Sequence, residues 1–393
     1  MTYDIIFPFA MADPDSGGKP TRHPQQRSVD FIRRELIPEM VHDRCFCEPG
    51  SREFVEFDSA DVEPLDVDGC STSSTSCELY RVMARVKFSG ETRSFPLIVK
   101  LPKNSADCPL PAAAAAAAGS FQNEEMFYSK MTLEYGTDSV PKCYLSDLGR
   151  YGQPVIVLED LGARGYVRVH RKLDEDHLKL CVKALATFHG RGLRLRAEKL
   201  AVFREFYAKL SDTCFDDDSV ERCRRNCARV LDVLKLLAEP ALVEKIRGKL
   251  SESPLDVMES LAREINDVST VCHGRFSRDN VLFRYESGRP SDVKVIDWQT
   301  MRYCSPAIDL GLVLLANLPD AEVAEVGPFC RDIMRLYLDA VMREYPLMDR
   351  DLLERDVIAK LLFAYVVLCT DETIADVELL AMLRALDELT TFD

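Results

Sequence analysis

The sequence has no apolar run long enough to cross a membrane. Its longest strongly apolar stretches are Leu361–Cys369 and Leu310–Leu318, far short of the ~20 residues that a spanning helix needs. An export signal is not expected either, because the short apolar patch Ile5–Met11 contains Pro8 and does not follow a basic region. We therefore expect a cytoplasmic protein without a membrane span.

Basic residues are the minority among the charged side chains. The 393-residue chain has 50 Lys and Arg against 65 Asp and Glu, a formal net charge of −15. A surface of that sign repels phosphate backbones, so we expect no nucleic-acid partner. The net charge does not exclude a local basic pocket for a small anion. The apolar fraction of 47% and charged fraction of 29% exclude a wholly disordered, collagen-like or coiled-coil chain.

Familiar chemical motifs are missing as well. The 14 cysteines form no Cys-x-x-Cys pair, and in a reducing compartment we expect them to be free thiols or buried apolar side chains. The sequence has no GxxxxGK[ST], GxSxG or HExxH, and Gly190-x-Gly192 lacks the third glycine of a dinucleotide-binding turn. These absences leave hydrolase, Rossmann and zinc-protease hypotheses without support.

The order of β-type and helical sequence patterns along the chain predicts an α+β protein with two lobes. Residues 1–27 are polar and contain Pro and Gly, which indicates a flexible leader. Residues 28–160 hold short β-type runs with an Ala-rich, low-complexity insertion near 109–119 and form a small β-rich N-lobe. The alanine run could be helical on propensity, but it lacks any polar pattern. Residues 161–393 are mostly helical and form a larger C-lobe. A cleft between such lobes is the usual place for a ligand.

Hydrophobic periodicity gives approximate bounds for the individual elements. Beyond Ile308 we expect helices that are broken at three prolines, Pro319, Pro328 and Pro346. The strands expected are 54–57, 79–88, 95–101, 154–158, 281–286 and 292–297, and the helices are 28–41, 121–135, 219–237 and 255–265.

One hairpin in the helical part carries the pattern of a metal site. Asn280 precedes the strand 281–286, and Asp297 ends the strand 292–297. The hairpin brings these two residues to one end. Amide and carboxylate oxygens suit a Mg²⁺ ion shared with substrate phosphates, and a loop Asn with a strand-end Asp holds the metals in kinases. An ordinary surface hairpin is the alternative.

The N-terminal half supplies a second pair, in the chain order that a kinase fold requires. Lys100 ends the β-type run F-P-L-I-V-K, as a phosphate-binding lysine does, and Glu124 lies in the helix that follows. Glu124 is placed to orient the lysine. The adjacent Glu125 is the alternative partner, and a solvated strand end is the alternative for Lys100.

Together these pieces resemble the CHK kinase-like, or ecdysteroid kinase-like, family, whose relatives are choline kinases and aminoglycoside phosphotransferases. The resemblance covers about residues 30–390 and is specific because of the order of its pieces, each of which is weak alone. The pieces are L-I-V-K-L-P at 97–102, F-Q-N-E-E-M-F-Y at 121–128, V-P-K-C-Y at 140–144, V-L-E-D-L at 157–161, L-A-T-F-H-G at 185–190, H-G-R-F-S-R-D-N-V-L-F at 273–283, V-K-V-I-D-W-Q at 293–299 and S-P-A-I-D-L at 305–310.

The resemblance implies a protein-kinase-like fold that transfers the γ-phosphoryl group of ATP to a hydroxyl group of a small molecule. It implies that Lys100 contacts the α- and β-phosphates and that Glu124 holds Lys100. The backbone of Glu159–Leu161 would bond adenine at the hinge between the lobes. Asn280 and Asp297 would bind Mg²⁺.

A Ser-rich turn after Gly69 would cover the phosphates. This turn has a single glycine, so it provides less well for close approach of the backbone than a Gly-rich loop does. The acceptor pocket is expected among helices within 165–270 and 310–390.

The sequence departs from the family pattern at the catalytic base. The family has His-Gly-Asp, where the Asp lies near the attacking hydroxyl, and this chain has Arg275 after His273. A guanidinium stays protonated and cannot accept the proton. Asp279 is a weaker substitute base beside Asn280, and His273 is expected to shape the loop.

Loss of a general base costs roughly 10²–10⁴-fold in rate. The function expected is therefore an impaired ATP- and Mg²⁺-dependent phosphotransferase that acts on a small-molecule hydroxyl, with a steroid-like alcohol suggested by the family. The alternative is a pseudokinase that binds nucleotide or a small ligand without transfer. A purely structural interaction protein is a third reading, against which the Lys–Glu pair and the Asn–Asp pair argue.

We expect structural roles for three further residues. We expect His189 to be a buried, hydrogen-bonded histidine and Trp298, the only tryptophan, to pack beneath the metal site. Asp309 either braces the catalytic loop or caps the helix that follows it.

Overall fold

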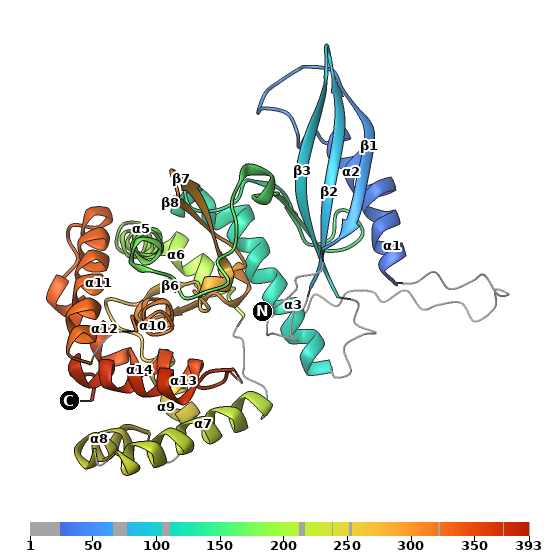
Figure 1. Ribbon diagram of the computed structural model, residues 1–393. Helices are drawn as coiled ribbons and strands as arrows, with labels where there is room; N and C mark the ends of the chain where they lie inside the picture. The colour runs from blue at the N-terminus through green and yellow to red at the C-terminus, as the bar shows by residue number, and fades with distance from the viewer. Residues whose placement is uncertain are drawn as a thin grey trace, which may run out of the picture.

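The chain folds into a small sheet-based lobe and a larger helical lobe, the α+β class expected from the sequence (Figure 1). The expected leader up to residue 23 and the turn with Gly69 lie outside the described residues. The end of that leader was placed too late, because a helix already begins at Pro24. The computed structural model describes residues 24–65, 77–103, 111–211, 217–237, 239–250, 254–320, 323–371 and 373–392.

An antiparallel sheet forms the small lobe, and within the described residues its strand order is β1-β2-β3-β5-β4. A helical segment lies along one side of it (Figure 1). That segment runs through α1 and α2, with a π-type turn at Ile32–Leu36 between them. The elements are α1 (Pro24–Phe31), α2 (Ile37–His42), β1 (Val55–Pro64), β2 (Cys77–Phe88), β3 (Thr92–Pro102), β4 (Cys143–Asp147) and β5 (Val155–Glu159).

The two faces of the sheet have different partners, because side chains alternate along a strand. On β3, Val99 and Leu101 pack with the helical segment 24–42 in one core cluster. On β5, Ile156 and Leu158 belong instead to the core of the helical lobe. Lys100 lies between Val99 and Leu101 and therefore points to the opposite face, towards the helical lobe.

A long helix follows the sheet's third strand and lies between the two lobes (Figure 1). It comprises α3 (Pro111–Met126), a π-type turn (Phe127–Met131) and α4 (Thr132–Tyr135), and it ends at Gly136 with a φ of 82°. The alanines 112–118 belong to α3, as their helix propensity allowed. Alanine has the highest intrinsic helix propensity, and the run extends the helix predicted at 121–135.

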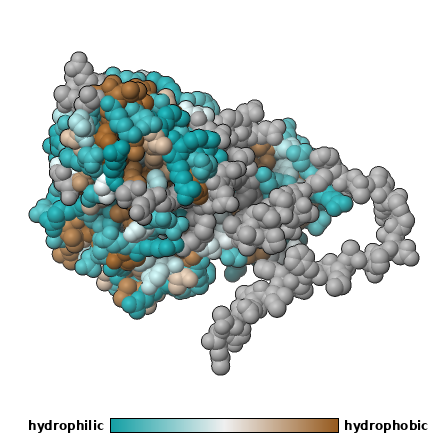
Figure 2. Space-filling view, turned by 90° about the horizontal axis from the view of Figure 1, so that it is seen from below, coloured by the Kyte–Doolittle hydropathy of each residue, from teal (hydrophilic) through white to brown (hydrophobic). Residues whose placement is uncertain are grey.

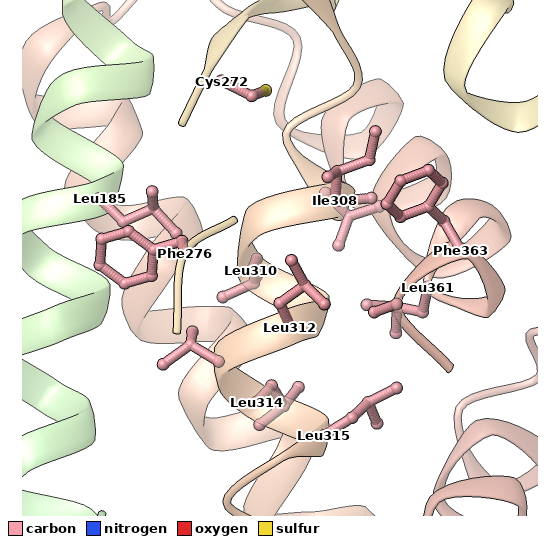
Figure 3. Packing of buried hydrophobic residues seen from close by; sticks show 14 of the residues in the cluster. Leu185, Cys272, Phe276, Ile308, Leu310, Leu312, Leu314, Leu315, Leu361 and Phe363 are labelled. Carbon is pink, nitrogen blue, oxygen red and sulfur yellow. The ribbon is translucent and has the colours of Figure 1, made fainter. Parts of the chain in front are cut away.

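The helical lobe is built around α10, every residue of which is buried. Leucines on several sides of α10 meet side chains from α5 and from the start of α13 (Figure 3). A helix that is apolar all round belongs in a core. The bounds are α5 (Glu175–Glu198), α6 (Leu200–Tyr207), α7 (Asp217–Leu236), α8 (Pro240–Leu250), α9 (Pro254–Arg263), β6 (Thr270–Cys272), β7 (Val281–Glu286), β8 (Arg289–Val295), β9 (Arg302–Cys304), α10 (Ala307–Leu315), α11 (Val323–Glu344), α12 (Arg350–Lys360), α13 (Leu362–Leu368) and α14 (Asp376–Glu388), with 3-10 turns at Gly162–Arg164, Arg278–Asn280 and Trp298–Thr300.

One expected helix break is wrong. Pro319 and Pro346 lie between helices, but Pro328 lies inside α11. A proline within a helix costs about 3 kcal/mol. Here α11 packs along α5 over much of its length, and tertiary packing of this kind contributes most of a helix's stability.

The surface seen from below is mostly hydrophilic, with smaller hydrophobic areas between the polar ones (Figure 2). No helix in the described part of the chain combines the length and the apolar character needed to cross a membrane.

Candidate active site

Three charged side chains meet where the sheet lobe faces the helical lobe. Lys100 Nζ on β3 donates a hydrogen bond to Glu124 Oε2 on α3 at 2.5 Å and another to Asp297 Oδ1 at 2.9 Å. Lys100 and Glu124 are buried, and the side chain of Asp297 keeps 39% of its exposure. The lysine therefore joins the sheet, α3 and the end of the β7–β8 hairpin.

The charges of this cluster depend on one another. Burial alone disfavours the ammonium group of Lys100, but the two carboxylates outweigh it and raise its pKa. Burial alone would raise the pKa of Asp297, yet the nearby Lys100 and Arg275 lower it. Burial, with repulsion from Asp297, raises the pKa of Glu124 despite its lysine partner. Asp297 is thus an anion held next to a cation, which is the state a metal ligand needs.

The hairpin brings Asn280 and Asp297 to one end, as the sequence predicts. Val281 pairs with Val295, and Ile296 N donates to Asn280 O at 2.9 Å. The Asn280 amide donates through Nδ2 to Arg275 O at 3.0 Å, which fixes the direction of its oxygen. Asp297 has a φ of 67°, a left-handed conformation that Asp tolerates better than most residues. An amide oxygen and a carboxylate at one hairpin end are a donor set that fits Mg²⁺.

The His-Gly turn before Arg275 is held by Asp309 at the start of α10. Asp309 accepts from His273 N at 2.6 Å and from Gly274 N at 2.8 Å. Burial would raise the pKa of Asp309, but His189 and His273 lower it. The carboxylate bonds that a brace for the loop requires are present, whereas the amide of Ala307 at the start of α10 donates to Ser305 Oγ at 3.2 Å and not to Asp309.

His189 and Cys272 lie close enough to Asp309 for the three to resemble a metal site, with ligand atoms within 4.8 Å of one another. Their hydrogen bonds give a simpler account. His189 contacts Asp309 Oδ2 through Nε2 at 3.1 Å and the Tyr337 hydroxyl through Nδ1 at 2.8 Å. The Cys272 thiol donates to Ser305 O at 3.5 Å. This cluster is a buried hydrogen-bond network that needs no cation.

Position 274 requires glycine. Gly274 has a φ of 85°, and a Cβ added there would lie 1.9 Å from Thr300 O. The neighbouring His273 ring donates from Nε2 to Ile296 O at 3.0 Å and accepts at Nδ1 from Arg275 N at 3.3 Å. Burial lowers the pKa of His273, so its ring is neutral and joins the turn to Ile296, the residue before Asp297. This geometry is the one that a loop-shaping role requires.

Arg275 is exposed beside the charged cluster. Within the described residues Asp297 forms its ion pair with Lys100, while Arg275 acts on Asp297 only through its charge. Asp279 is also exposed and has Arg278 Nε at 4.0 Å. It sits in the turn Arg278–Asn280, so neither residue puts a buried base into the loop.

The segment Glu159–Leu161 leaves β5 at the edge of the helical lobe. The Glu159 carboxylate accepts from Lys142 N at 2.9 Å, and Asp160 accepts from Gly162 N at 2.8 Å. These side chains shape the turn that leaves β5.

Trp298 follows Asp297 and stacks on Phe127, with 3.8 Å between ring centroids and 10° between planes. Trp298 is buried directly after Asp297 in the chain. A cavity of about 30 Å³ beside it, lined by Phe127, Phe188 and Val295 among others, has room for little more than a water molecule. It is too small for a nucleotide or an acceptor.

The sequence analysis missed two residues. Asn123 is fully buried and bonds to Gln299 O at 2.9 Å, and Gln299 Nε2 donates to Glu124 Oε2 at 3.3 Å. A polar residue on the apolar face of the helix 121–135 was the available signal for Asn123.

A family model places this site in a known group. The model of the ecdysteroid kinase-like family matches residues 75–340, a span that includes Lys100, Glu124 and the loop from His273 to Asp297. The chain belongs to the ecdysteroid kinase-like family. No curated protein matches it in sequence.

Several solved structures resemble this ecdysteroid kinase-like protein distantly. An ethanolamine kinase from Plasmodium vivax is 11% identical, with 93% of this chain and 89% of that chain covered and a TM-score of 0.45. A putative aminoglycoside phosphotransferase from Ralstonia eutropha is 15% identical, with 91% and 97% covered and a TM-score of 0.41. A GDP complex of an aminoglycoside 2'-phosphotransferase is 15% identical, with 85% and 89% covered and a TM-score of 0.39. The family assignment does not depend on these likenesses.

Proposed function

We propose that this ecdysteroid kinase-like protein binds ATP with Mg²⁺ and transfers the γ-phosphoryl group to a hydroxyl of a small molecule, at a rate reduced by Arg275. The contact of Lys100 with both Glu124 and Asp297 carries the proposal. A buried lysine between two carboxylates holds a fixed positive charge at the junction of the lobes, where phosphates need one.

The phosphate end of the site would use residues of both lobes. Lys100 would contact the α- and β-phosphates, and Glu124 would keep its ammonium group in place. Asn280 and Asp297 are the residues that would hold Mg²⁺, which when bound neutralises charge on the phosphate oxygens. The backbone of Glu159–Leu161 would bond adenine.

The acceptor end lacks its base. Arg275 cannot take the hydroxyl proton, so the proton must leave to water or to another group such as Asp279. Phosphoryl transfer depends mostly on positioning and on stabilisation of charge, and those parts of the site are kept. A slow enzyme is therefore a better hypothesis than a protein without transfer activity. The acceptor is a hydroxylated small molecule, and the family suggests a steroid-like alcohol.

Arg275 also favours a second candidate function. A pseudokinase would keep the Lys100–Glu124 pair and the metal ligands for binding, and it would not need the base. Nucleotide or small-ligand binding without transfer is its expected behaviour.

The test compares three proteins, the wild type, Arg275→Asp and Arg275→Ala, in phosphotransfer from ATP with Mg²⁺ to steroid, choline-like and sugar alcohols. We expect Arg275→Asp to raise turnover by roughly 10²–10⁴-fold with little change in ATP affinity. An equal gain with Arg275→Ala would mean that the arginine charge inhibits. Wild-type turnover equal to that of Arg275→Asp would contradict the missing-base argument and direct attention to Asp279. ATP binding without transfer by any of the three would favour the pseudokinase.

A further inference from the structure

Asn123 connects three segments that are distant in the sequence. Its Nδ2 donates to Ser211 O at 3.0 Å and to Gln299 O at 2.9 Å, and its Oδ1 accepts from Ser211 N at 2.9 Å. The side chain is fully buried in α3. A buried amide with all these bonds made specifies one arrangement of its neighbours, since any unmade bond is costly.

The contact with Ser211 is close along the helix face. One helical turn before Asn123 stands Gly119, and a Cβ added to Gly119 would lie 2.8 Å from Ser211 Cβ. Residues 208–211 follow α6 and precede the described start of α7 at Asp217. The end of this segment, Ser211, is therefore seated directly on α3.

The other side of Asn123 reaches the charged cluster. Gln299, whose carbonyl accepts from Asn123, donates through Nε2 to Glu124 Oε2. Glu124 is the next residue along α3 and holds Lys100. Hydrogen bonds through Asn123, Gln299 and Glu124 thus connect the 208–211 segment to Lys100.

We propose that Asn123 is a positioning residue that couples the 208–211 segment to the Lys100–Glu124–Asp297 cluster. Its consequence for catalysis rests on the proposed function. A shift of the 208–211 segment would then move the lysine that is proposed to contact the phosphates.

Trp298 provides a readout that needs neither ATP nor turnover. It is the only tryptophan of the chain, it lies between Asp297 and Gln299, and it stacks on Phe127. Its emission therefore reports the arrangement of the segment that Asn123 holds.

The sharpest perturbation is Gly119→Ala. Alanine raises helix propensity, so α3 is not weakened, but the added Cβ forces Ser211 away from the helix. We expect a changed Trp298 emission and roughly tenfold weaker binding of Mg²⁺-ATP, the effect of about one lost buried hydrogen bond. The matched control is Ala118→Gly at the exposed neighbouring position, which lowers helix propensity and leaves the contact intact. It should change neither readout by more than about twofold.

Asn123→Asp and Asn123→Ala test the amide itself, with exposed Gln122→Ala as their control. Aspartate can still accept from Ser211 N but cannot donate to Gln299 O. We expect both variants to reproduce the altered Trp298 emission of Gly119→Ala. Folded Gly119→Ala and Asn123→Asp proteins with wild-type emission would overturn the proposal. If the wild type binds no Mg²⁺-ATP, the proposed function fails, while the emission of the nucleotide-free variants still decides the coupling.

Discussion

Lys100 and Asp297 are 197 residues apart in the sequence, and their side chains hydrogen-bond at 2.9 Å. The first comes from the sheet lobe and the second from the helical lobe, so this ion pair spans the junction between them. In the proposed function the same two residues turn to the nucleotide phosphates and to the metal. Their mutual contact therefore defines the state of the site before a nucleotide enters.

Nucleotide binding should depend on Mg²⁺ and on Asp297. A ligand that binds only the folded protein stabilises it by ~2.7 kcal/mol at 100 times its dissociation constant. We expect ATP with Mg²⁺ to raise the unfolding temperature of the wild type, and Asp297→Ala to lose the Mg²⁺ dependence. Thermal unfolding with ATP, with and without Mg²⁺, measures both. A Mg²⁺ dependence that persists in Asp297→Ala would show that the metal assignment is wrong.

Lys100 and Glu124 should act as a unit. Lys100→Met and Glu124→Ala are each expected to weaken ATP binding, and the double variant should cost less than the sum, because contacting residues are not additive. Breaking a buried pair is expected to reduce the free energy of unfolding by about 3–5 kcal/mol in each single variant. Calorimetric titration with ATP and urea unfolding give the two sets of values.

Glu125→Ala is the matched control for that cycle. Glu125 is adjacent in sequence but only half-buried, and its side chain contacts Ser129 rather than Lys100. It should leave ATP binding unchanged. Strict additivity of the Lys100 and Glu124 variants, together with coupling between Lys100 and Glu125, would mean that the neighbour is the true partner.

Position 274 should tolerate no side chain, whereas position 288 should tolerate one. Both have positive φ, 85° and 79°, but a Cβ at Gly274 meets Thr300 O and a Cβ at Gly288 meets nothing within 4 Å. Gly288→Ala is expected to cost about 1–2 kcal/mol from backbone strain alone. Gly274→Ala should cost clearly more and should also weaken Mg²⁺-ATP binding. Equal urea midpoints for the two variants would contradict the close approach to Thr300.

His273 should contribute to the pH dependence of stability. Its pKa in the folded protein lies below the ordinary value of 6.5 because of burial. The unfolded chain therefore binds the proton first, and the contribution of His273 is complete above pH 6.5 and declines as the pH falls below it. Urea unfolding of the wild type and His273→Asn between pH 7.5 and 5 should show a shallower decline in the variant, by up to about 1.4 kcal/mol per pH unit. Identical slopes would mean that the ring is not buried in its neutral form.

The hairpin and the Lys–Glu pair could be predicted from the sequence because local patterns encode them. Strand periodicity placed Lys100, and the spacing from Asn280 to Asp297 fixed which end of the hairpin they share. Pro328 and the alanine run could not be placed in the same way. A proline is unfavourable inside a helix, so nothing local marks the first as helical, and the second has helix propensity but no polar pattern. The bonds of Asn123 with Ser211 and Gln299 join segments 88 and 176 residues away, and a single sequence contains no signal for such distant pairs.

The buried helix α10 has a consequence for the motion of the loop that it holds. His273 and Gly274 lie outside regular secondary structure, but their amide groups bond to a carboxylate rooted in the most deeply buried helix of the described residues. Opening the loop would strip that carboxylate of its partners inside the core. The amide hydrogens of these two residues should therefore exchange with solvent as slowly as those of the core helices, through global unfolding. The His-Gly turn then belongs to the same cooperative unit as the core helices of the helical lobe.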